Sequence, residues 1–123
     1  MDFNDNKPIY LQLVDQIMDE VERPGFEHQA RLPSVREYAL STGVNPNTVM
    51  RAYTLLQQNG IIHNKRGVGY FYEPNAKENV LRIRREQFFS KELPYIIDRM
   101  IVLGISPKEI EKCYNQTKEN LNN

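Results

Sequence analysis

Residues 32–71 read LPSVREYALSTGVNPNTVMRAYTLLQQNGIIHNKRGVGYF, and this stretch predicts two short helices joined by a turn and followed by a hairpin. Ser34 and Glu37 have the spacing of a capping box, in which two side chains satisfy unpaired backbone N–H groups where a helix begins. Gly43 supplies the left-handed residue that ends a helix without steric cost. The Asn-Pro pair at 45–46 then caps a second helix and places proline at its first position, where a missing N–H costs nothing.

Two helices are therefore expected, at about residues 35–42 and 46–58. A turn of three or four residues that contains glycine, as here, joins the helices of a helix-turn-helix. Beyond Gly60, β runs at about 61–64 and 69–73, joined through residues 65–68, predict a hairpin wing. Because this arrangement serves mainly to place a helix in the major groove, the stretch predicts DNA binding.

The spacing of apolar residues predicts a further helix in the first domain and the inward face of the second helix of the pair. Apolar residues recur every four positions between Pro8 and about Arg23, which predicts an amphipathic helix. Its inward residues are expected to be Ile9, Leu13, Ile17 and Val21, with Tyr10, Val14 and Met18 beside them. In the second helix of the pair, Val49, Ala52, Tyr53 and Leu56 share the face expected to point to the core.

The same residues carry a family resemblance. Pro8-Ile9-Tyr10 with Gln12, then LPSVRE, VNPNTVMRAY, NGII and RGVGYF, follow one another in the order and spacing of the GntR family of bacterial transcription regulators. The chain resembles that family over roughly residues 8–72. The NPNTV form and the short remainder most resemble the YtrA subfamily, whose C-terminal part is only two helices. The resemblance implies a DNA-binding regulator of nearby transport genes, and it supports a dimer.

The chain departs from the family pattern at two positions. Pro46 stands where many members have an arginine, so the resemblance does not carry that arginine's contact to this chain. Gln29 stands near a position where many members have a glycine, which implies only a differently shaped loop before the helix pair.

Charge is unevenly distributed although the net charge is zero. Residues 1–30 hold two basic and seven acidic side chains, whereas residues 31–66 hold five basic side chains and Glu37 alone as an acid. Positive charge is thus concentrated in the segment expected to face phosphate, as an electrostatic footprint for DNA requires.

Composition excludes several other classes of protein. No apolar run approaches the roughly 18 residues of a membrane span, and no signal peptide is recognisable, so a cytoplasmic protein is expected. Cys113 is the sole cysteine, which excludes a disulfide framework, and it lies on an apolar stripe where we expect it to be buried. His28 and His63 lack ligand spacing, so neither a metal nor a cofactor is expected. No catalytic triad, carboxylate pair or phosphate loop is present, and the chain is not expected to be an enzyme.

The candidate DNA contacts lie on the helix pair and the wing. The N-terminal residues of a recognition helix read base edges, and here these are Asn47, Thr48 and, one turn on, Arg51. Asparagine pairs with adenine and arginine with guanine, while threonine suits a phosphate or a thymine methyl group.

The remaining contacts are expected at the flanks of that helix. The family's arginine at the position of Arg36 is a DNA contact, and the helix N-terminus at Ser34 suits phosphate. A narrow glycine tip at Gly67, beside Lys65 and Arg66, suits the minor groove.

After Pro74 the pattern changes to long amphipathic helices. One is expected over residues 79–103 with a kink at Pro94, because the proline ring removes a hydrogen bond and crowds the carbonyl of Ser90. A second capping box, with Pro107 at the first helical position, begins a helix that extends to about Leu121. A lone pair of such helices cannot bury both apolar faces. They are expected either to fold back on the winged domain or, preferably, to dimerise through Phe88, Phe89, Leu93, Ile97 and Met100.

The expected fold is therefore mostly α (α+β). Residues 1–74 form a winged helix-turn-helix domain, and residues 75–123 form a two-helix dimerisation hairpin. The favoured function is a homodimeric repressor on a palindromic operator in double-stranded DNA, and any small-molecule effector would have to bind at the dimer seam. The alternative is a protein-interaction adaptor, because winged helices also serve without touching DNA; an enzyme is the least favoured class.

Overall fold

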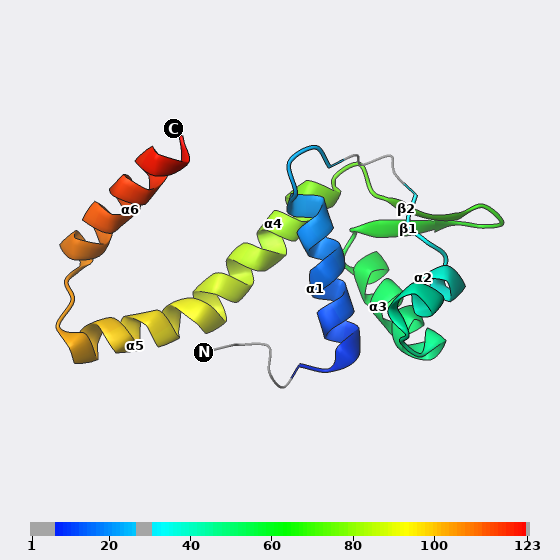
Figure 1. Cartoon of the computed structure of the whole chain (residues 1–123), viewed down its shortest axis with the longest axis horizontal. Helices are drawn as coiled ribbons and strands as arrows, with labels where there is room; N and C mark the ends of the chain where they lie inside the picture. The colour runs from blue at the N-terminus through cyan, green and yellow to red at the C-terminus, as the bar shows by residue number, and fades with distance from the viewer. Residues whose placement is uncertain (1–6, 27–30, 123) are drawn as a thin grey trace. The chain divides into compact units, whose positions relative to one another are not determined.

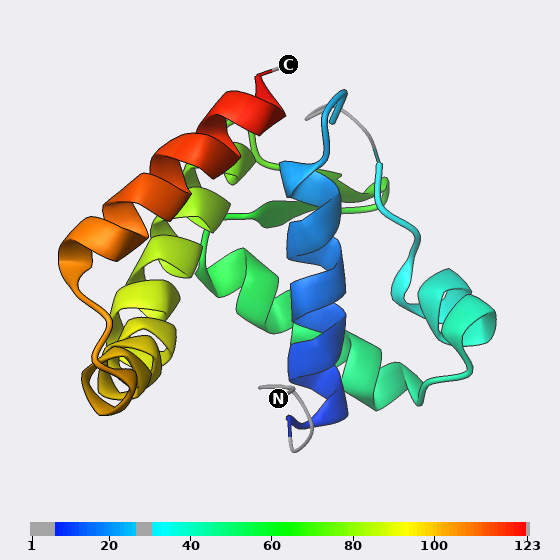
Figure 2. The same ribbon diagram turned by 60° about the vertical axis from the view of Figure 1, so that its left-hand side comes forward.

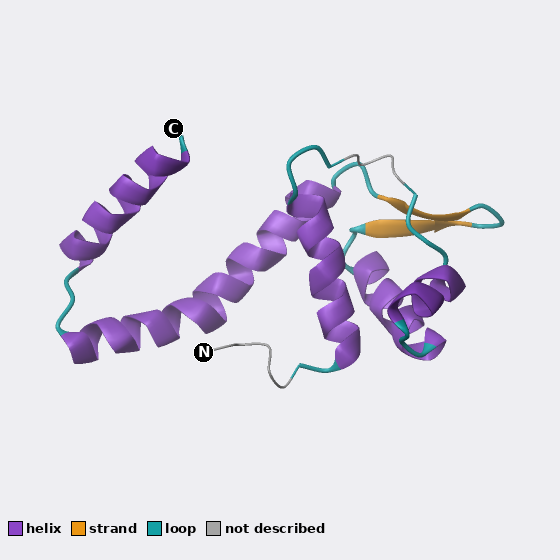
Figure 3. Cartoon of the chain, in the orientation of Figure 1, coloured by secondary structure: helices purple, strands orange, loops and turns teal. Residues whose placement is uncertain are grey.

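A computed structural model describes residues 7–26 and 31–122; the loop positions His28 and Gln29 lie outside this part. The chain divides into two compact units, residues 1–83 and 84–123. The described elements, shown in Figures 1 and 3, are α1 (Ile9–Glu22), α2 (Val35–Thr42), α3 (Pro46–Gln58), β1 (Ile62–Lys65), β2 (Gly69–Tyr72), α4 (Ala76–Gln87), the π-helical segment η1 (Phe88–Glu92), α5 (Leu93–Leu103) and α6 (Pro107–Leu121).

The helix-turn-helix forms through the predicted local signals. The Ser34 hydroxyl accepts a hydrogen bond from the Glu37 N–H (3.0 Å), while the Ser34 N–H donates to the Glu37 carboxylate (3.3 Å), which completes the capping box. Gly43 ends α2 with φ of 72°, a conformation that costs an L side chain energy. The Asn45 side chain caps α3 by accepting from the Asn47 N–H at 2.8 Å. The predicted bounds of both helices are confirmed.

The core of the first unit lies where α1 and α2 pack on α3 (Figure 2). The predicted inward face of α3 is confirmed, because Val49, Ala52, Tyr53 and Leu56 are all fully buried. On α1 the prediction holds except at Ile9, which is 57% exposed. Ile9 is the first residue of α1, so no preceding turn covers it. The remaining buried apolar residues are Leu13, Val14, Ile17, Met18, Val21, Leu32, Ala39, Ile61, Ile62, Ala76 and Val80.

The wing is an antiparallel pair, with Ile62 opposite Tyr72 and Lys65 opposite Gly69. β1 begins and ends one residue later than predicted, and β2 ends one residue earlier. The segment that precedes α2 also joins this sheet, since the Leu32 N–H donates to the Tyr70 carbonyl at 2.9 Å. The backbone before the helix pair and the wing are therefore held together.

The first unit extends past the wing into α4. Ala76 and Val80 are buried in the core, and the Asn79 side-chain amide donates to the Gly60 carbonyl at 2.8 Å. The boundary between the compact units falls after Ile83 because these two turns of α4 pack with the winged domain.

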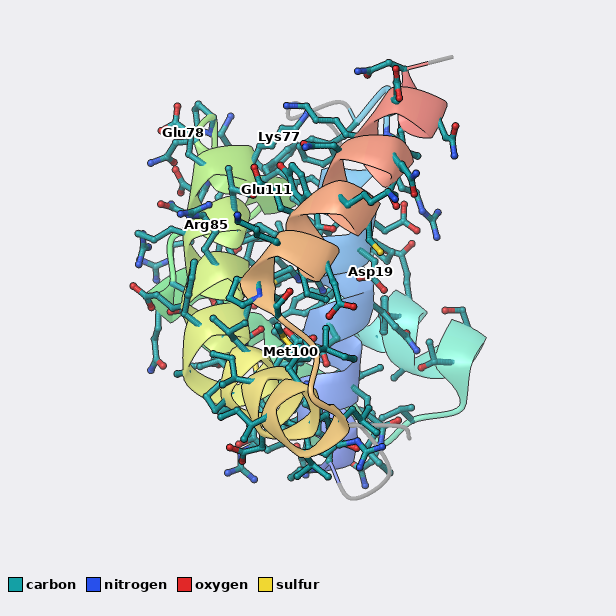
Figure 4. The ribbon with its side chains drawn as sticks, turned by 90° about the vertical axis from the view of Figure 1, so that its left-hand side faces the viewer. Asp19, Lys77, Glu78, Arg85, Met100 and Glu111 are labelled. Atoms are coloured by element: carbon teal, nitrogen blue, oxygen red, sulfur yellow. The ribbon has the colours of Figure 1, made fainter. Side chains whose placement is uncertain are left out.

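The second unit contains the end of α4, then η1, α5 and α6. The helix predicted over residues 79–103 begins earlier, at Ala76. Directly before the predicted kink site at Pro94 it contains a π-helical segment over Phe88–Glu92, where the Leu93 N–H donates to the Phe88 carbonyl. No described residue of α5 or α6 is buried. Cys113 is exposed, so the prediction of a buried cysteine is wrong for the single chain. Figure 4 shows side chains of these helices, with Met100 on α5 and Glu111 on α6.

Candidate nucleic-acid interface

The surface of helix α3 has three parts with different neighbours: the core, α1 and the wing. One face is buried in the core, and a second edge lies along α1, where Arg51 is placed. A third edge lies beside the wing, where the Tyr70 hydroxyl is 4.0 Å from the Met50 sulfur. Asn47, Met50 and Thr54 are exposed and share one strip of the helix surface, with Met50 on the side of the wing.

The beginning of α3 offers a polar tip. Asn47 is exposed on its first turn, and its backbone N–H is already bound to the Asn45 side chain. Thr48 is half-buried, and its backbone N–H donates to the Asn45 carbonyl at 2.9 Å. Of these two predicted readers, Asn47 is therefore the more accessible.

Arg51 has a neighbour that sequence reasoning did not foresee. Its guanidinium carbon lies 3.9 Å from the centre of the Tyr10 ring on α1, which is a close cation–π contact. The contact holds the arginine at the α1 edge of α3, while the residue itself remains exposed.

Ser34 and Arg36 flank the recognition helix from α2. Ser34 is half-buried as a residue, and its hydroxyl is engaged in the capping box, as expected for a helix cap. Arg36 is exposed on the first turn of α2. The structure thus brings one exposed cation to the N-terminus of α2.

The wing tip presents the other predicted cations. Lys65, Arg66 and Gly67 are exposed, and the Lys65 ammonium lies 5.0 Å from the centre of the Phe71 ring. The tip closes by a hydrogen bond from the Val68 N–H to the Lys65 carbonyl at 2.9 Å. Gly67 has φ of 79°, so glycine suits the turn for conformational reasons as well as for its small size.

Arg31 adds a cation that was not singled out as a contact. A Cβ atom on Gly69 would lie 2.8 Å from the Arg31 Nε, so this guanidinium lies against the wing backbone. Its location next to LPSVRE and its charge were visible in the sequence, but its packing on the wing was not.

A tyrosine cluster links the parts of this surface. Tyr53 is fully buried and its hydroxyl donates to the Pro33 carbonyl at 2.6 Å, directly before α2. Burial is the main cause that raises the pKa of Tyr53, so the phenol remains a donor. Its ring packs edge-on against Tyr70 of β2, with centroids 4.8 Å apart. The start of α2, helix α3 and the wing are thereby held in one arrangement.

The described residues contain no group of three His, Cys, Asp or Glu side chains that could hold a metal ion. His63 instead lies beside Glu73, with 3.0 Å between Nδ1 and a carboxylate oxygen. Over the same part of the chain, no helix is long and apolar enough to cross a membrane.

The five predicted dimerisation residues lie on η1 and α5. Phe88 and Phe89 contact edge to face, with centroids 5.5 Å apart, and both are exposed. Ile97 is 43% exposed, while Leu93 and Met100 are half-buried.

The comparison with known proteins agrees with this arrangement of a helix-turn-helix, a wing and exposed cations. The model of the gntR family of bacterial regulatory proteins matches residues 9–71. The chain belongs to the GntR family. The expected winged helix-turn-helix and mostly helical fold are confirmed by solved relatives.

Three relatives of this GntR-family chain show how far the similarity extends. The HTH-type transcriptional regulator YhcF of Bacillus subtilis is 35% identical over 88% of this chain and 88% of the relative. The HTH-type transcriptional repressor YtrA of the same organism is 33% identical over 97% of this chain and 88% of its own length. A crystal structure of a GntR-family regulator from Bacteroides thetaiotaomicron has a TM-score of 0.77 and 43% identity, and it covers 93% of this chain and 99% of the other. This GntR-family protein is thus a transcription regulator with a DNA-binding helix-turn-helix, and its relatives are regulators rather than enzymes.

Proposed function

We propose that this regulator is a homodimeric, cytoplasmic repressor that binds a palindromic operator through α3 and the wing. The observation that carries the proposal is the contact between Met50 and Tyr70, because it joins the exposed edge of α3 to the wing strand. A helix that enters the major groove and a wing that reaches the adjacent groove need this common orientation.

Each predicted contact has a role in this proposal. Asn47, Thr48 and Arg51 read base edges in the major groove, for which Arg51 turns from the Tyr10 ring toward a guanine. Ser34 and Arg36 bind phosphate at the N-terminus of α2. The tip Lys65-Arg66-Gly67 enters the minor groove, where two cations meet a strongly negative potential.

Residues 75–123 are proposed as the dimerisation region. The support is the apolar surface that one chain leaves uncovered, including Phe89 (56% exposed), Ile101 (73%) and Val102 (75%). A two-fold pair of chains would bury such residues and present two recognition helices to the two halves of a palindrome.

The direction of regulation rests on the relatives. The B. subtilis relative YtrA is a repressor and matches 97% of this chain, which supports repression. The resemblance to the YtrA subfamily supports a transport-related operon as the target. Deleting the gene should then raise transcription of the operon that the protein binds.

The test is DNase I footprinting of the region upstream of the protein's own gene, followed by affinity measurements at several salt concentrations. We expect a symmetric protected site that is bound about 10³-fold or more tightly than random duplex. Affinity should fall linearly with salt on a log–log plot, because phosphate contacts release counterions. Equal affinity for both duplexes, without salt dependence, would contradict the proposal and favour a protein-interaction adaptor.

A further inference from the structure

We propose that Met50 and Thr54 form an apolar reading patch on α3 that recognises the 5-methyl group of thymine in the operator, with Tyr70 as a positioning residue. The inference rests on the proposed function, since it names what one part of the DNA-binding surface reads.

Met50 is an exposed apolar side chain on an otherwise polar face. Its exposed fraction is 45%, whereas Met18 in the core of the same unit is only 2% exposed. Met50 lies three residues after Asn47 and four before Thr54, so the three residues share one strip of the helix surface. Met50 is the member of this strip that lies beside the wing.

Thr54 extends the apolar character of the strip. Its hydroxyl donates to the Met50 carbonyl at 2.9 Å, which engages the polar group of the side chain within the helix. The methyl group is then the part of the Thr54 side chain that is available to contact DNA. At Met50 and Thr54 the exposed surface of α3 therefore presents a thioether and a methyl group, while the one hydroxyl proton of Thr54 is already donated within the helix.

Tyr70 gives the flexible methionine a defined neighbour. The Tyr70 hydroxyl lies 4.0 Å from the Met50 sulfur, and the Tyr70 ring packs against the buried Tyr53. Tyr53 is in turn fixed by its hydrogen bond to the Pro33 carbonyl. The thioether is thus placed beside the wing by a series of contacts that begins in the core.

Thymine is the base that such a patch can distinguish. In the major groove thymine presents a C5-methyl group, whereas guanine, adenine and cytosine present only hydrogen-bonding groups at their edges. A methionine has no N–H or O–H to donate and is only a weak acceptor, but it packs well on irregular apolar surface.

The test uses the footprinted operator with single thymines replaced by deoxyuridine, which removes the methyl group and leaves base pairing intact. Wild-type protein should lose roughly four-fold in affinity at one or two thymines per half-site, the effect of burying one methyl-sized group. Met50→Ala should bind the thymine and deoxyuridine duplexes equally at those positions. Arg36→Ala, changed at a proposed phosphate contact, is the matched control and should keep the four-fold difference.

Tyr70→Phe tests the positioning role, because it keeps the ring and removes the hydroxyl. We expect an unchanged thermal midpoint and a reduced deoxyuridine effect. An undiminished effect in Tyr70→Phe would remove Tyr70 from the proposal.

Two results would overturn the inference on Met50 while leaving the proposed function intact. Wild-type protein could bind the operator and be indifferent to every deoxyuridine, or Met50→Ala could fold and retain the full methyl effect. A failure of the wild-type protein to prefer any duplex would instead overturn the proposed function itself.

Discussion

Arg36 and Arg51 are both exposed arginines on the helix pair, but their surroundings differ. Arg51 rests over the Tyr10 ring, whereas Arg36 projects from the first turn of α2. An arginine near the middle of a recognition helix can pair bidentately with guanine, while one at the N-terminus of the preceding helix meets the DNA backbone. The two residues should therefore contribute in measurably different ways.

Arg51→Ala should cost about 1–3 kcal/mol of binding free energy on the operator and much less on random duplex, because a lost base contact affects only the cognate sequence. Fluorescence anisotropy with both duplexes checks this expectation. Equal losses on the two duplexes would refute the base-reading role.

Arg36→Ala provides the contrasting outcome. It should weaken binding to both duplexes and reduce the log–log salt slope by about one, as expected for one lost phosphate contact. Because Arg51→Ala also removes the contact with Tyr10, both variants should be measured well below their thermal midpoints.

At the scale of the element, the charged side chains of the wing and the glycine that shapes its turn are different residues, so their contributions can be tested separately. Its cations Lys65 and Arg66 are outside the core, so changing them leaves the buried face of the hairpin untouched. Gly67 has φ of 79° with open space around its Cα, so a larger residue there is opposed by backbone strain rather than by a clash. The tip can therefore be altered without dismantling the domain.

Replacing Lys65 and Arg66 together with alanine should lower operator affinity strongly. Gly67→Val should also impair binding, because the side chain blocks close approach and because a φ of 79° strains the turn. Gel-shift titration at physiological salt measures the affinity, and circular dichroism checks the fold. Val68→Ala is the matched control, because Val68 is a neutral, 55% exposed residue of the same turn. If the double variant binds as tightly as the wild type, the wing is only structural.

For the whole molecule, the decisive feature is the apolar surface that α5 and α6 leave exposed. Fully burying each large apolar side chain contributes about 1.5–3 kcal/mol, whereas association costs an estimated 4–15 kcal/mol in lost freedom. Several such residues per chain are therefore needed, and Phe89, Ile97, Ile101 and Val102 are among those available.

Leu93→Glu or Phe89→Glu should give a folded monomer that binds the full operator poorly, because a buried carboxylate opposes the dimer. Light scattering coupled to size exclusion measures the mass. Leu40→Glu places the same charge on an 80% exposed leucine of the first unit and should leave the dimer intact. A wild-type monomer at micromolar concentration would contradict the proposed dimer.

The sequence by itself determined those features that depend on neighbouring residues. Capping boxes, an Asn-Pro start and a glycine stop act within one helical turn, so the bounds of α2 and α3 and the beginning of α6 could be predicted from spacing alone. The buried face of α3 followed for the same reason, since helical periodicity assigns Val49 and Leu56 to one side.

Tertiary structure alone decided which surfaces meet. The burial of Ala76 and Val80 with the winged domain, the stacking of Arg51 on Tyr10 and the contact of Met50 with Tyr70 each join residues that belong to different elements. Local propensity carries no information about such pairs, because they form only when packing brings distant segments together. The predicted readers could therefore be named from the sequence, but their neighbours, and the apolar patch between them, required the fold.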